Sequence, residues 1–238
     1  MRHQRIVVLL GVLTLALLTG CADAPGTPSG EGPITVTPTP LDSSTSAAQL
    51  QAQMLDAVKA SLSTHVSGLV TTTGTPVTVD VVTNALRRTH GTVIVAGHVL
   101  EVVANDQNLY VRADASYWNA VAPALSSLVA NKWARTPVSR PAFHAFAPLL
   151  NYDALVTAPL STTGDLTEST ATILEGQAAR ALSNATTQIL ILPANSPLPS
   201  SFSSDSFGNV RYSEWGPVLP YPVPSADVVD IQPNQLVS

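Results

Sequence analysis

The sequence predicts an α+β domain with a largely antiparallel sheet, and three observations lead to this class. The folded part opens with an amphipathic helix pattern, two groups of short apolar segments follow, and a strongly apolar helical stretch separates the two groups. Closely spaced strands that are joined by short turns favour antiparallel pairing. No repeat with a period of about 20 to 50 residues is present, which argues against a solenoid or propeller.

The N-terminus has the pattern of an export signal. Arg2 and Arg5 precede an uncharged apolar run over residues 6–18, which is shorter than the roughly 20 residues of a spanning helix. The run ends in Leu-Thr-Gly-Cys21, which resembles the lipobox of bacterial lipoproteins. We expect residues 1–20 to be a lipoprotein signal peptide and Cys21 to be lipidated, which would hold the protein on the extracytoplasmic face of a cell membrane. The alternative is an ordinary secretory signal with an incidental cysteine.

Composition limits the kinds of partner. The 16 acidic side chains outnumber the 11 basic ones, and charged residues are only 11% of the chain. Nucleic acid and anionic lipid head groups select clustered Lys and Arg, so we expect neither as a direct partner. The single cysteine leaves no partner for an intramolecular disulfide. Residues 21–45 are rich in Pro, Ser and Thr and predict a disordered tether, while residues 46–238 predict a single domain.

The first half of the domain predicts one helix and then a meander of strands. Leu50, Met54, Val58 and Leu62 recur at four-residue spacing after the candidate N-caps in 43–46, which indicates an amphipathic helix. The alternation of Val77, Val79 and Val81 with polar residues indicates a half-buried strand. Further strands are predicted at residues 92–96, 99–104 and 108–112.

The middle of the chain predicts a helix over residues 117–129 that is apolar around most of its circumference. Its apolar residues include Trp118, Val121, Leu125 and Leu128. Such a helix must be buried against a sheet or against a ligand, and the pattern leaves both open. Phe143 and Phe146 continue the apolar character, and strands are then predicted at residues 171–174, 178–182, 187–192 and 210–215, ahead of an extended Pro-rich segment, 217–224.

Several short motifs resemble those of the LppX/LprG family of actinobacterial lipoproteins, whose fold is similar to that of the LolA-type lipoprotein carriers. The motifs lie between the first helix and the last strand of the chain. They are Ser63-Thr64-His65-Val66-Ser67-Gly68, Asn108-Leu109-Tyr110-Val111-Arg112 with Trp118, Asn131-Lys132-Trp133-Ala134-Arg135, Leu174-Glu175-Gly176-Gln177-Ala178, Tyr212-Ser213-Glu214-Trp215-Gly216 and Asp227-Val228-Val229-Asp230. The sequence departs from the family between residues 192 and 209, where a Pro-rich stretch replaces a simple strand pair.

The resemblance implies a strongly curved sheet, an unclosed half-barrel, with helices packed on its concave face. It also implies an apolar cavity that holds the acyl chains of a lipid or lipoglycan ligand, so the protein would carry or present lipid in the cell envelope. The residues that we expect to line this cavity are Trp118, Val121, Leu125, Leu128, Phe143, Phe146, Val77, Val79 and Val81.

A second interpretation is a non-enzymatic envelope interaction or regulatory module with a filled core that binds a membrane protein partner. Segment 217–224 with Tyr221 would suit such docking, because Pro-rich stretches are already extended. The same segment could instead cover an edge of the sheet, because Pro protects edges.

The sequence contains no pattern that supports catalysis. It has no Gly-x-Ser-x-Gly elbow, no Gly-rich phosphate loop and no His-Glu-x-x-His, so we expect no catalytic residues, no cofactor and no enzyme activity. His65, His90, His98 and His144 lie in unrelated segments, so no metal site is expected, because metals need several ligands at defined spacing. We expect a monomer.

Overall fold

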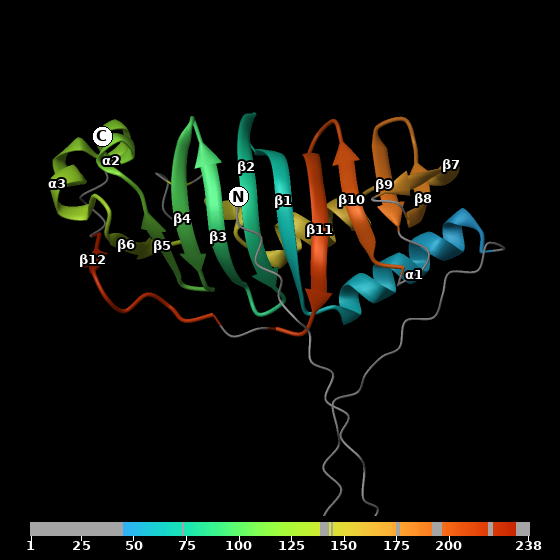
Figure 1. Ribbon diagram of the computed structural model, residues 1–238, viewed down its shortest axis with the longest axis horizontal. Helices are drawn as coiled ribbons and strands as arrows, with labels where there is room; N and C mark the ends of the chain where they lie inside the picture. The colour runs from blue at the N-terminus through green and yellow to red at the C-terminus, as the bar shows by residue number, and fades with distance from the viewer. Residues whose placement is uncertain are drawn as a thin grey trace, which may run out of the picture. The chain divides into compact units, whose positions relative to one another are not determined.

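The computed structural model describes residues 45–72, 74–138, 143, 145–174, 177–191, 197–218 and 221–231. The predicted signal peptide, Cys21, nearly all of the tether and His144 lie outside the described residues. The described part forms a curved, unclosed sheet of twelve strands together with short helices, which confirms the predicted α+β class and the largely antiparallel sheet (Figure 1). No helix in this part of the chain is long and apolar enough to span a bilayer.

The strands occur in the sheet in the order β12-β6-β5-β4-β3-β2-β1-β11-β10-β9-β8-β7. Neighbouring strands are antiparallel except for β12 and β6, which are parallel. The strands are β1 (Ser63–Thr72), β2 (Thr75–Asn84), β3 (Arg88–Val95), β4 (His98–Ala104), β5 (Asn108–Arg112), β6 (Trp133–Pro137), β7 (Thr167–Leu174), β8 (Gln177–Ser183), β9 (Thr187–Ile191), β10 (Pro199–Ser204), β11 (Gly208–Gly216) and β12 (Val228–Asp230).

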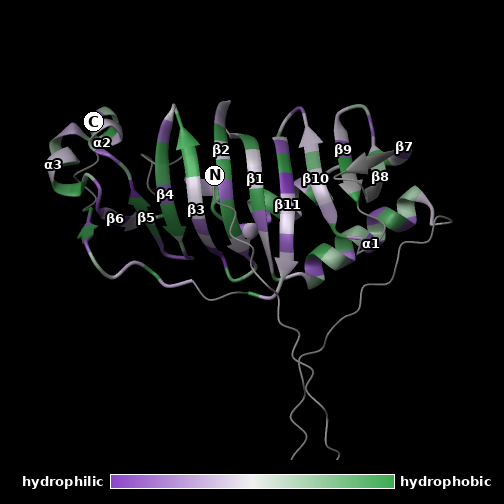
Figure 2. Cartoon of the chain, in the orientation of Figure 1, coloured by the Kyte–Doolittle hydropathy of each residue, from purple (hydrophilic) through white to green (hydrophobic). Residues whose placement is uncertain are grey.

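The first helix, α1 (Ala47–Ala60), begins at a capping box, as a Ser followed three residues later by Gln allows. The Gln49 amide donates to Ser46 Oγ at 3.3 Å, and the Ser46 amide donates to Gln49 Oε1 at 3.0 Å. The alternating hydropathy of α1 is visible in Figure 2, and three of its four predicted apolar residues are fully buried. The fourth, Leu62, lies beyond the helix and is 46% exposed.

The predicted meander is present as β2, β3, β4 and β5. Inner-facing residues alternate with exposed ones along β2, because successive side chains point to opposite faces of a sheet. Residues 63–68, the first of the motifs that resemble the LppX/LprG family, begin β1. The β-branched Thr64 and Val66 favour a strand there, and β11 supplies a pairing partner from far along the chain.

The predicted helix over residues 117–129 is wrong as one element. It consists of α2 (Ala115–Val121), the 3₁₀-helix η1 (Pro123–Leu125) and α3 (Ser126–Val129). Pro123 interrupts it, because proline has no amide hydrogen and its ring clashes with the preceding turn. Ala122 accordingly adopts an extended φ of −155°.

A second set of short helices lies behind the middle of the sheet in Figure 1. It comprises η3 (Ala147–Leu149), the π-helix η4 (Asp153–Thr157) and α4 (Ala158–Ser161). We call the segments from α2 to α3 and from η3 to α4, together with Phe143 and Phe146, the helical layer. Its buried side chains share one hydrophobic core with α1 and with the inner face of the sheet.

The stretch between residues 192 and 209 also differs from expectation. Residues 192–196 lie outside the described part, but Pro199–Ser204 form β10, which pairs with both β9 and β11. A tight turn, in which the Phe207 amide donates to Ser204 Oγ at 3.2 Å, joins β10 to β11. The Pro-rich stretch therefore precedes the strand pair and leaves it intact.

The C-terminal strap, residues 221–231, crosses the outward face of the sheet and ends beside β6. Tyr221 stacks on His90 of β3 with ring centroids 3.7 Å apart, and the Arg135 side chain donates two hydrogen bonds to Asp230, at 2.5 and 2.7 Å. Val103 and Tyr110 lie between these contacts in one cross-strand row and are about 5% exposed, although their side chains point away from the main core. In segment 217–224, Tyr221 thus lies on the outward face of the central strand β3 and not along an edge strand, which differs from the predicted edge cover.

The stacked imidazole gives a testable pH dependence. Burial lowers the pKa of His90 below its ordinary value of 6.5, and the charge of His65 lowers it further. The unfolded chain therefore binds a proton more readily than the folded chain, so this group's contribution to stability is present above pH 6.5 and is lost as the pH falls through the lowered pKa. Replacing Tyr221 by alanine should expose the ring and raise the pKa of His90 towards 6.5, as read by an NMR titration.

Val223 provides the matched control, because it is 44% exposed in the same strap. Val223→Ala should leave the His90 titration in place. An unchanged titration in Tyr221→Ala would mean that the strap does not set the environment of His90.

Candidate functional site

Most of the residues predicted to line a cavity lie in one apolar cluster. Val77, Val79 and Val81 on β2 form part of its wall and are at most 1% exposed. The helical layer contributes four of the predicted residues that are also buried, namely Trp118, Leu125, Phe143 and Phe146. Two predicted residues differ. Val121 is half-buried at the margin of the cluster, and Leu128 is 46% exposed, because the break at Pro123 turns α3 away from the direction of α2.

Aromatic rings form the centre of the cluster. Trp118 meets Phe143 edge-to-face with centroids 6.4 Å apart, and Phe143 meets Phe146 in the same way at 5.7 Å. Tyr117 packs against the other side of Trp118 at 5.2 Å. Edge-to-face pairs are favourable because the positive edge of one ring approaches the negative face of the next. The helical layer therefore presents a continuous aromatic surface to the inner face of the sheet.

One polar atom in this cluster is without a partner. The Trp118 Nε1–H is buried, and no acceptor for it is present among the described residues. A buried donor that makes no hydrogen bond costs about 1–3 kcal/mol, so most such groups in native proteins have a protein, water or ligand partner. Thr136 Oγ1 on strand β6 is likewise buried without a hydrogen-bond partner among the described residues.

Two tyrosines attach the helical layer to its neighbours. Tyr152 Oη donates to the Val58 carbonyl of α1 at 3.0 Å, and Tyr212 Oη of β11 donates to the Leu155 carbonyl of η4 at 3.0 Å. Burial raises the pKa of Tyr152 to about 12 and raises that of Tyr212 as well, so both hydroxyls keep their protons at neutral pH. The two tyrosine hydroxyls therefore connect the η4 region to α1 and to β11 through hydrogen bonds to backbone carbonyls.

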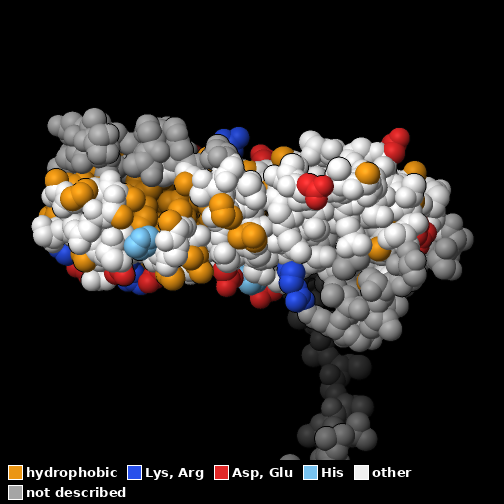
Figure 3. Space-filling view, turned by 90° about the horizontal axis from the view of Figure 1, so that it is seen from above, with side chains coloured by type: hydrophobic (Ala, Val, Ile, Leu, Met, Phe, Trp, Pro, Cys, Tyr) orange, Lys and Arg blue, Asp and Glu red, His pale blue; other side chains and the backbone are white. Residues whose placement is uncertain are grey.

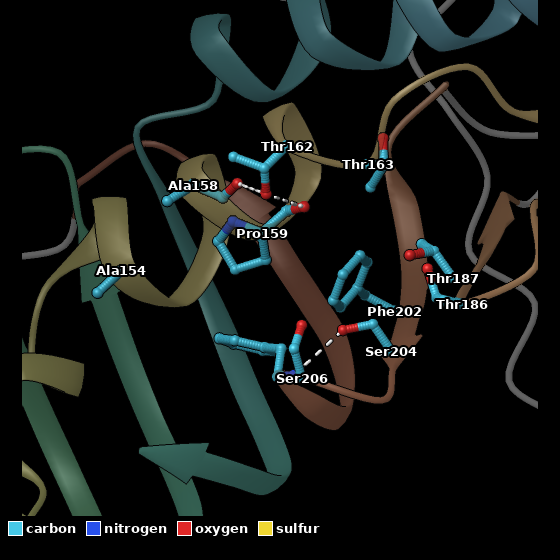
Figure 4. Close-up of a pocket in the computed structure, with 11 residues that line it drawn as sticks. Ala154, Ala158, Pro159, Thr162, Thr163, Thr186, Thr187, Phe202, Ser204 and Ser206 are labelled. Atoms are coloured by element: carbon cyan, nitrogen blue, oxygen red, sulfur yellow. Dashed lines mark hydrogen bonds between the residues drawn. The ribbon is translucent and has the colours of Figure 1, made fainter. Parts of the chain in front are cut away.

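A pocket of about 350 Å³ opens between the helical layer and strands β9 and β10. Figure 4 shows Pro159 and Thr162 on the helical side and Phe202 and Ser204 on the strand side. A second pocket of about 340 Å³ lies on the outward face near Glu101 and Arg112, which form an ion pair. Neither of these two pockets is lined by any of the predicted cavity residues. Trp118, Phe143 and Phe146 are at most 1% exposed, so no water-sized space adjoins their side chains.

Sequence reasoning missed the first pocket. Its polar residues come from three separate segments, 162–163, 186–187 and 204–206, and no spacing rule links them. The only signal was the Thr-Thr pairs at 162–163 and 186–187, which are common in a chain rich in Thr.

The histidines do not gather into a site. His65 contacts Asp80 at 2.5 Å and Ser213 Oγ at 3.3 Å, but all three lie on the open outward face, where Asp80 is 65% exposed. His98 lies 3.3 Å from Ser116, in the cross-strand row of Val95 and the inner-facing Val77. Within the described residues no three His, Cys, Asp or Glu side chains are grouped as a metal site would need.

Comparison with known proteins places the fold. No family model and no curated protein sequence matches the chain. Among solved structures, the chain is similar to the crystal structure of LprF from Mycobacterium bovis, with a TM-score of 0.54 and 16% sequence identity over 76% of this chain and 97% of that one. Nearly the whole of LprF thus has a counterpart here. The protein therefore has an LppX/LprG-like fold, as its short motifs predicted.

Proposed function

We propose that this protein is an envelope lipoprotein that binds the acyl chains of a lipid between the inner face of its sheet and its helical layer. The observation that carries the proposal is the buried Nε1–H of Trp118, a residue of the aromatic and aliphatic cluster, which has no acceptor among the described residues. A lipid that enters the cluster brings ester or amide carbonyl oxygens, which can accept this hydrogen bond. The LppX/LprG-like fold, a carrier or binding fold, supports the same ligand class.

The filled space around Trp118 sets a condition on entry. An acyl chain can reach the cluster only if the helical layer moves away from the sheet. Its helices are short, and the π-helix η4, which runs directly into α4, is of a kind that is frequent at functional sites. Burial of a sixteen-carbon chain contributes on the order of 10 kcal/mol before ordering costs, which is enough to offset partial separation of such a layer.

One end of the sheet offers a route for entry. Figure 3 shows hydrophobic side chains gathered on the part of the molecule that carries β2 to β4. At the turn from β3 to β4, Ile94 and Val99 lie directly opposite each other on the outward face of the sheet and are 37% and 59% exposed. Apolar side chains left in water beside this end of the sheet would bring an acyl chain from a membrane to the edge over which it reaches the interior.

The proposal includes the N-terminal anchor. Acyl chains on Cys21 would hold the protein to the membrane, and the Pro-rich residues that follow would let the domain move away from it. The intact mass of protein purified from an envelope-bearing host reports both parts, since acyl groups on Cys21 remain covalently attached and a lipid in the interior is released on unfolding. A ligand-free native mass would count against the carrier, and an unmodified Cys21 would count against the anchor.

Trp118→Phe is the decisive variant for the interior. It removes the Nε1–H but keeps an aromatic ring, so the affinity for the fluorescent methyl ester of parinaric acid should fall by about 2- to 10-fold, the value of one hydrogen bond. The matched control is Trp133→Phe, because Trp133 lies half-buried on the outward face against Arg112. Equal affinities for Trp118→Phe and the unchanged protein would contradict a ligand oxygen at Trp118.

A second function is favoured by the filled core itself. A close-packed interior also suits a module that binds a membrane protein partner through its surface, and the exposed Tyr221 and Val223 of the strap are available for such contacts. A photo-crosslinker at residue 221 separates the two functions in cells. Recovery of one protein and no interior lipid favours the module, whereas interior lipid without a crosslinked protein favours the carrier.

A further inference from the structure

The outward face of the sheet has an apolar end, where β1 turns into β2 and β3 turns into β4. Leu69 on β1, Ile94 on β3 and Val99 on β4 lie in one cross-strand row, with Thr78 of β2 between the first two. The three apolar side chains are 47%, 37% and 59% exposed. One further exposed pair, Thr71 with Pro76, lies between this row and the tip of the β1–β2 turn. We call the following residues the end patch: Leu69, Thr71, Pro76, Thr78, Ile94 and Val99.

These strands carry no charge at this end. Residues 66–79, which contain the β1–β2 turn, and residues 89–100, which contain the β3–β4 turn, include no Asp, Glu, Lys or Arg. The next outward row holds Asp80 and Glu101, two residues farther from the tips and thus about 7 Å along each strand. At the opposite end of β2 and β3, the turn region contains two arginines, residues 87–88. The end patch can therefore leave water without taking a charge with it, which would be costly.

The chain that precedes the domain is long enough to bring this end to a membrane. The described part begins beside β8, where the Arg180 side chain donates to the Thr45 carbonyl at 2.6 Å. In the sheet order β8 lies six strands from β3, which is about 29 Å along the sheet at the usual spacing of about 4.8 Å. Residues 21–44 would span about 70 Å if extended at about 3.1 Å per residue. A bilayer that held Cys21 would therefore be within reach of the end patch.

We propose that the end patch docks into a lipid bilayer. Its three exposed apolar side chains can remove only roughly 100–200 Å² from water, far less than the roughly 800 Å² per partner of a stable protein interface. A second copy of the chain would therefore not be held by this patch alone. A bilayer is held by a weaker contact, because an anchored domain stays at high local concentration beside it. The inference rests on the anchor of the proposed function but does not require a lipid in the interior.

The docking is shallow and does not depend on charge. The row of Asp80 and Glu101 stays at the level of the head groups, because amphipathic segments that lie in the interface bury their apolar side chains only about 5–10 Å deep. Figure 3, which looks onto this end, shows hydrophobic side chains gathered over β2 to β4. Since the end patch has no Lys or Arg, anionic lipid and salt concentration should not change its attachment.

A photo-crosslinker reports this contact in the full chain. We place p-benzoylphenylalanine at position 78, within the end patch, in protein that is made in an envelope-bearing host and held on phosphatidylcholine vesicles. The matched control places it at position 86, because Leu86 is 61% exposed in the turn at the other end of β2. We expect phosphatidylcholine adducts at position 78 in at least about tenfold higher yield than at position 86, by mass spectrometry. The yield should be the same when phosphatidylglycerol is added and at low and high salt.

A triple variant tests the apolar side chains themselves. Leu69→Thr, Ile94→Thr and Val99→Thr together keep β-branched residues at these strand positions, which strands favour. The adduct yield at position 78 should fall about tenfold, because each buried CH₂ contributes to membrane attachment. Leu86→Thr is the matched control and should leave the yield at position 78 unchanged. An unchanged yield in the triple variant would overturn the end patch as the docking surface.

The other outcomes separate the docking from the proposed function. Equal yields at positions 78 and 86, or no adduct at either, overturn the docking, as does a crosslinked second copy or another protein in place of lipid at position 78. The native mass of the same protein reports interior lipid. Interior lipid without adducts at position 78 overturns the docking alone and leaves the carrier. Adducts at position 78 on protein with a ligand-free interior support the docking and count against the carrier.

Discussion

Trp118→Ala is expected to lower the free energy of unfolding by about 3–5 kcal/mol, the usual cost of truncating a large buried aromatic residue. Trp118 is fully buried and packs edge-to-face against Tyr117 and Phe143. Its Nε1–H makes no hydrogen bond within the described part of the chain, so the loss should come from packing alone. Denaturant unfolding measures the change, and the melting temperature should fall by about 6–20 °C for a domain of this size.

Leu128→Ala is the control for this result. Leu128 follows Trp118 in the same apolar stretch but is 46% exposed, so its truncation should change stability by no more than about 0.5 kcal/mol. The two variants also test whether the interior is filled. A loss below about 1 kcal/mol in the free energy of unfolding of Trp118→Ala would show that the side chains around Trp118 collapse readily into the space or already leave space in solution. It would contradict a filled and rigid interior around Trp118.

Trp118 is buried and Leu128 is exposed, and this contrast shows what the sequence could not settle. Apolar periodicity correctly predicted that residues 117–129 contain buried side chains, because burial of apolar surface is a local preference repeated along the chain. It treated the segment as one helix and so placed Leu128 beside Leu125 in the interior. Pro123 was visible in the sequence, but the direction in which the chain continues after a proline depends on the surrounding structure.

Strand pairing could be predicted for the meander β2 to β5, and the pairings between distant segments could not be predicted. The strands β2 to β5 follow one another through short turns, so alternation and turn residues were enough to predict them. By contrast, β1 pairs with β11 from the far end of the domain, and β12 joins β6 in parallel, so neither arrangement leaves a pattern in the neighbouring residues. In the strand order β2-β1-β11-β10, the contact of β1 with β11 is the long-range step.

The two candidate sites differ in the same way. The apolar cluster was largely predicted, because Val77, Val79 and Val81 alternate and the aromatic residues stand out in composition. The hydroxyl-lined pocket could not be predicted, because it forms only where α4 meets the turns that flank β9 and β10. Ser and Thr are frequent throughout this chain, so their identity carried no information until the fold placed them together.

Gly91 should be a sensitive backbone position of the sheet. It lies on β3 opposite Val81 with a φ of +144°, a conformation that is essentially restricted to glycine. A Cβ at this position would lie 2.2 Å from the Asp80 carbonyl oxygen and 2.7 Å from the Val81 Cα, so the two strands would have to separate. Glycine kinks of this kind introduce curvature into a sheet. The curvature brings the inner face of β2 and β3 around the helical layer.

We expect Gly91→Ala to lower the free energy of unfolding by about 2–6 kcal/mol, with about 1–3 kcal/mol from the backbone conformation and about 1–3 kcal/mol from the steric overlap. Gly97→Ala is the matched control, because Gly97 also has a positive φ, +83°, but an added Cβ would meet no atom within 4 Å. Its cost should be only about 1–2 kcal/mol. Chemical denaturation of both variants measures the difference. Equal losses would mean that the strands part easily at Gly91, and the close approach of β2 and β3 would then not be what holds the curvature of the sheet.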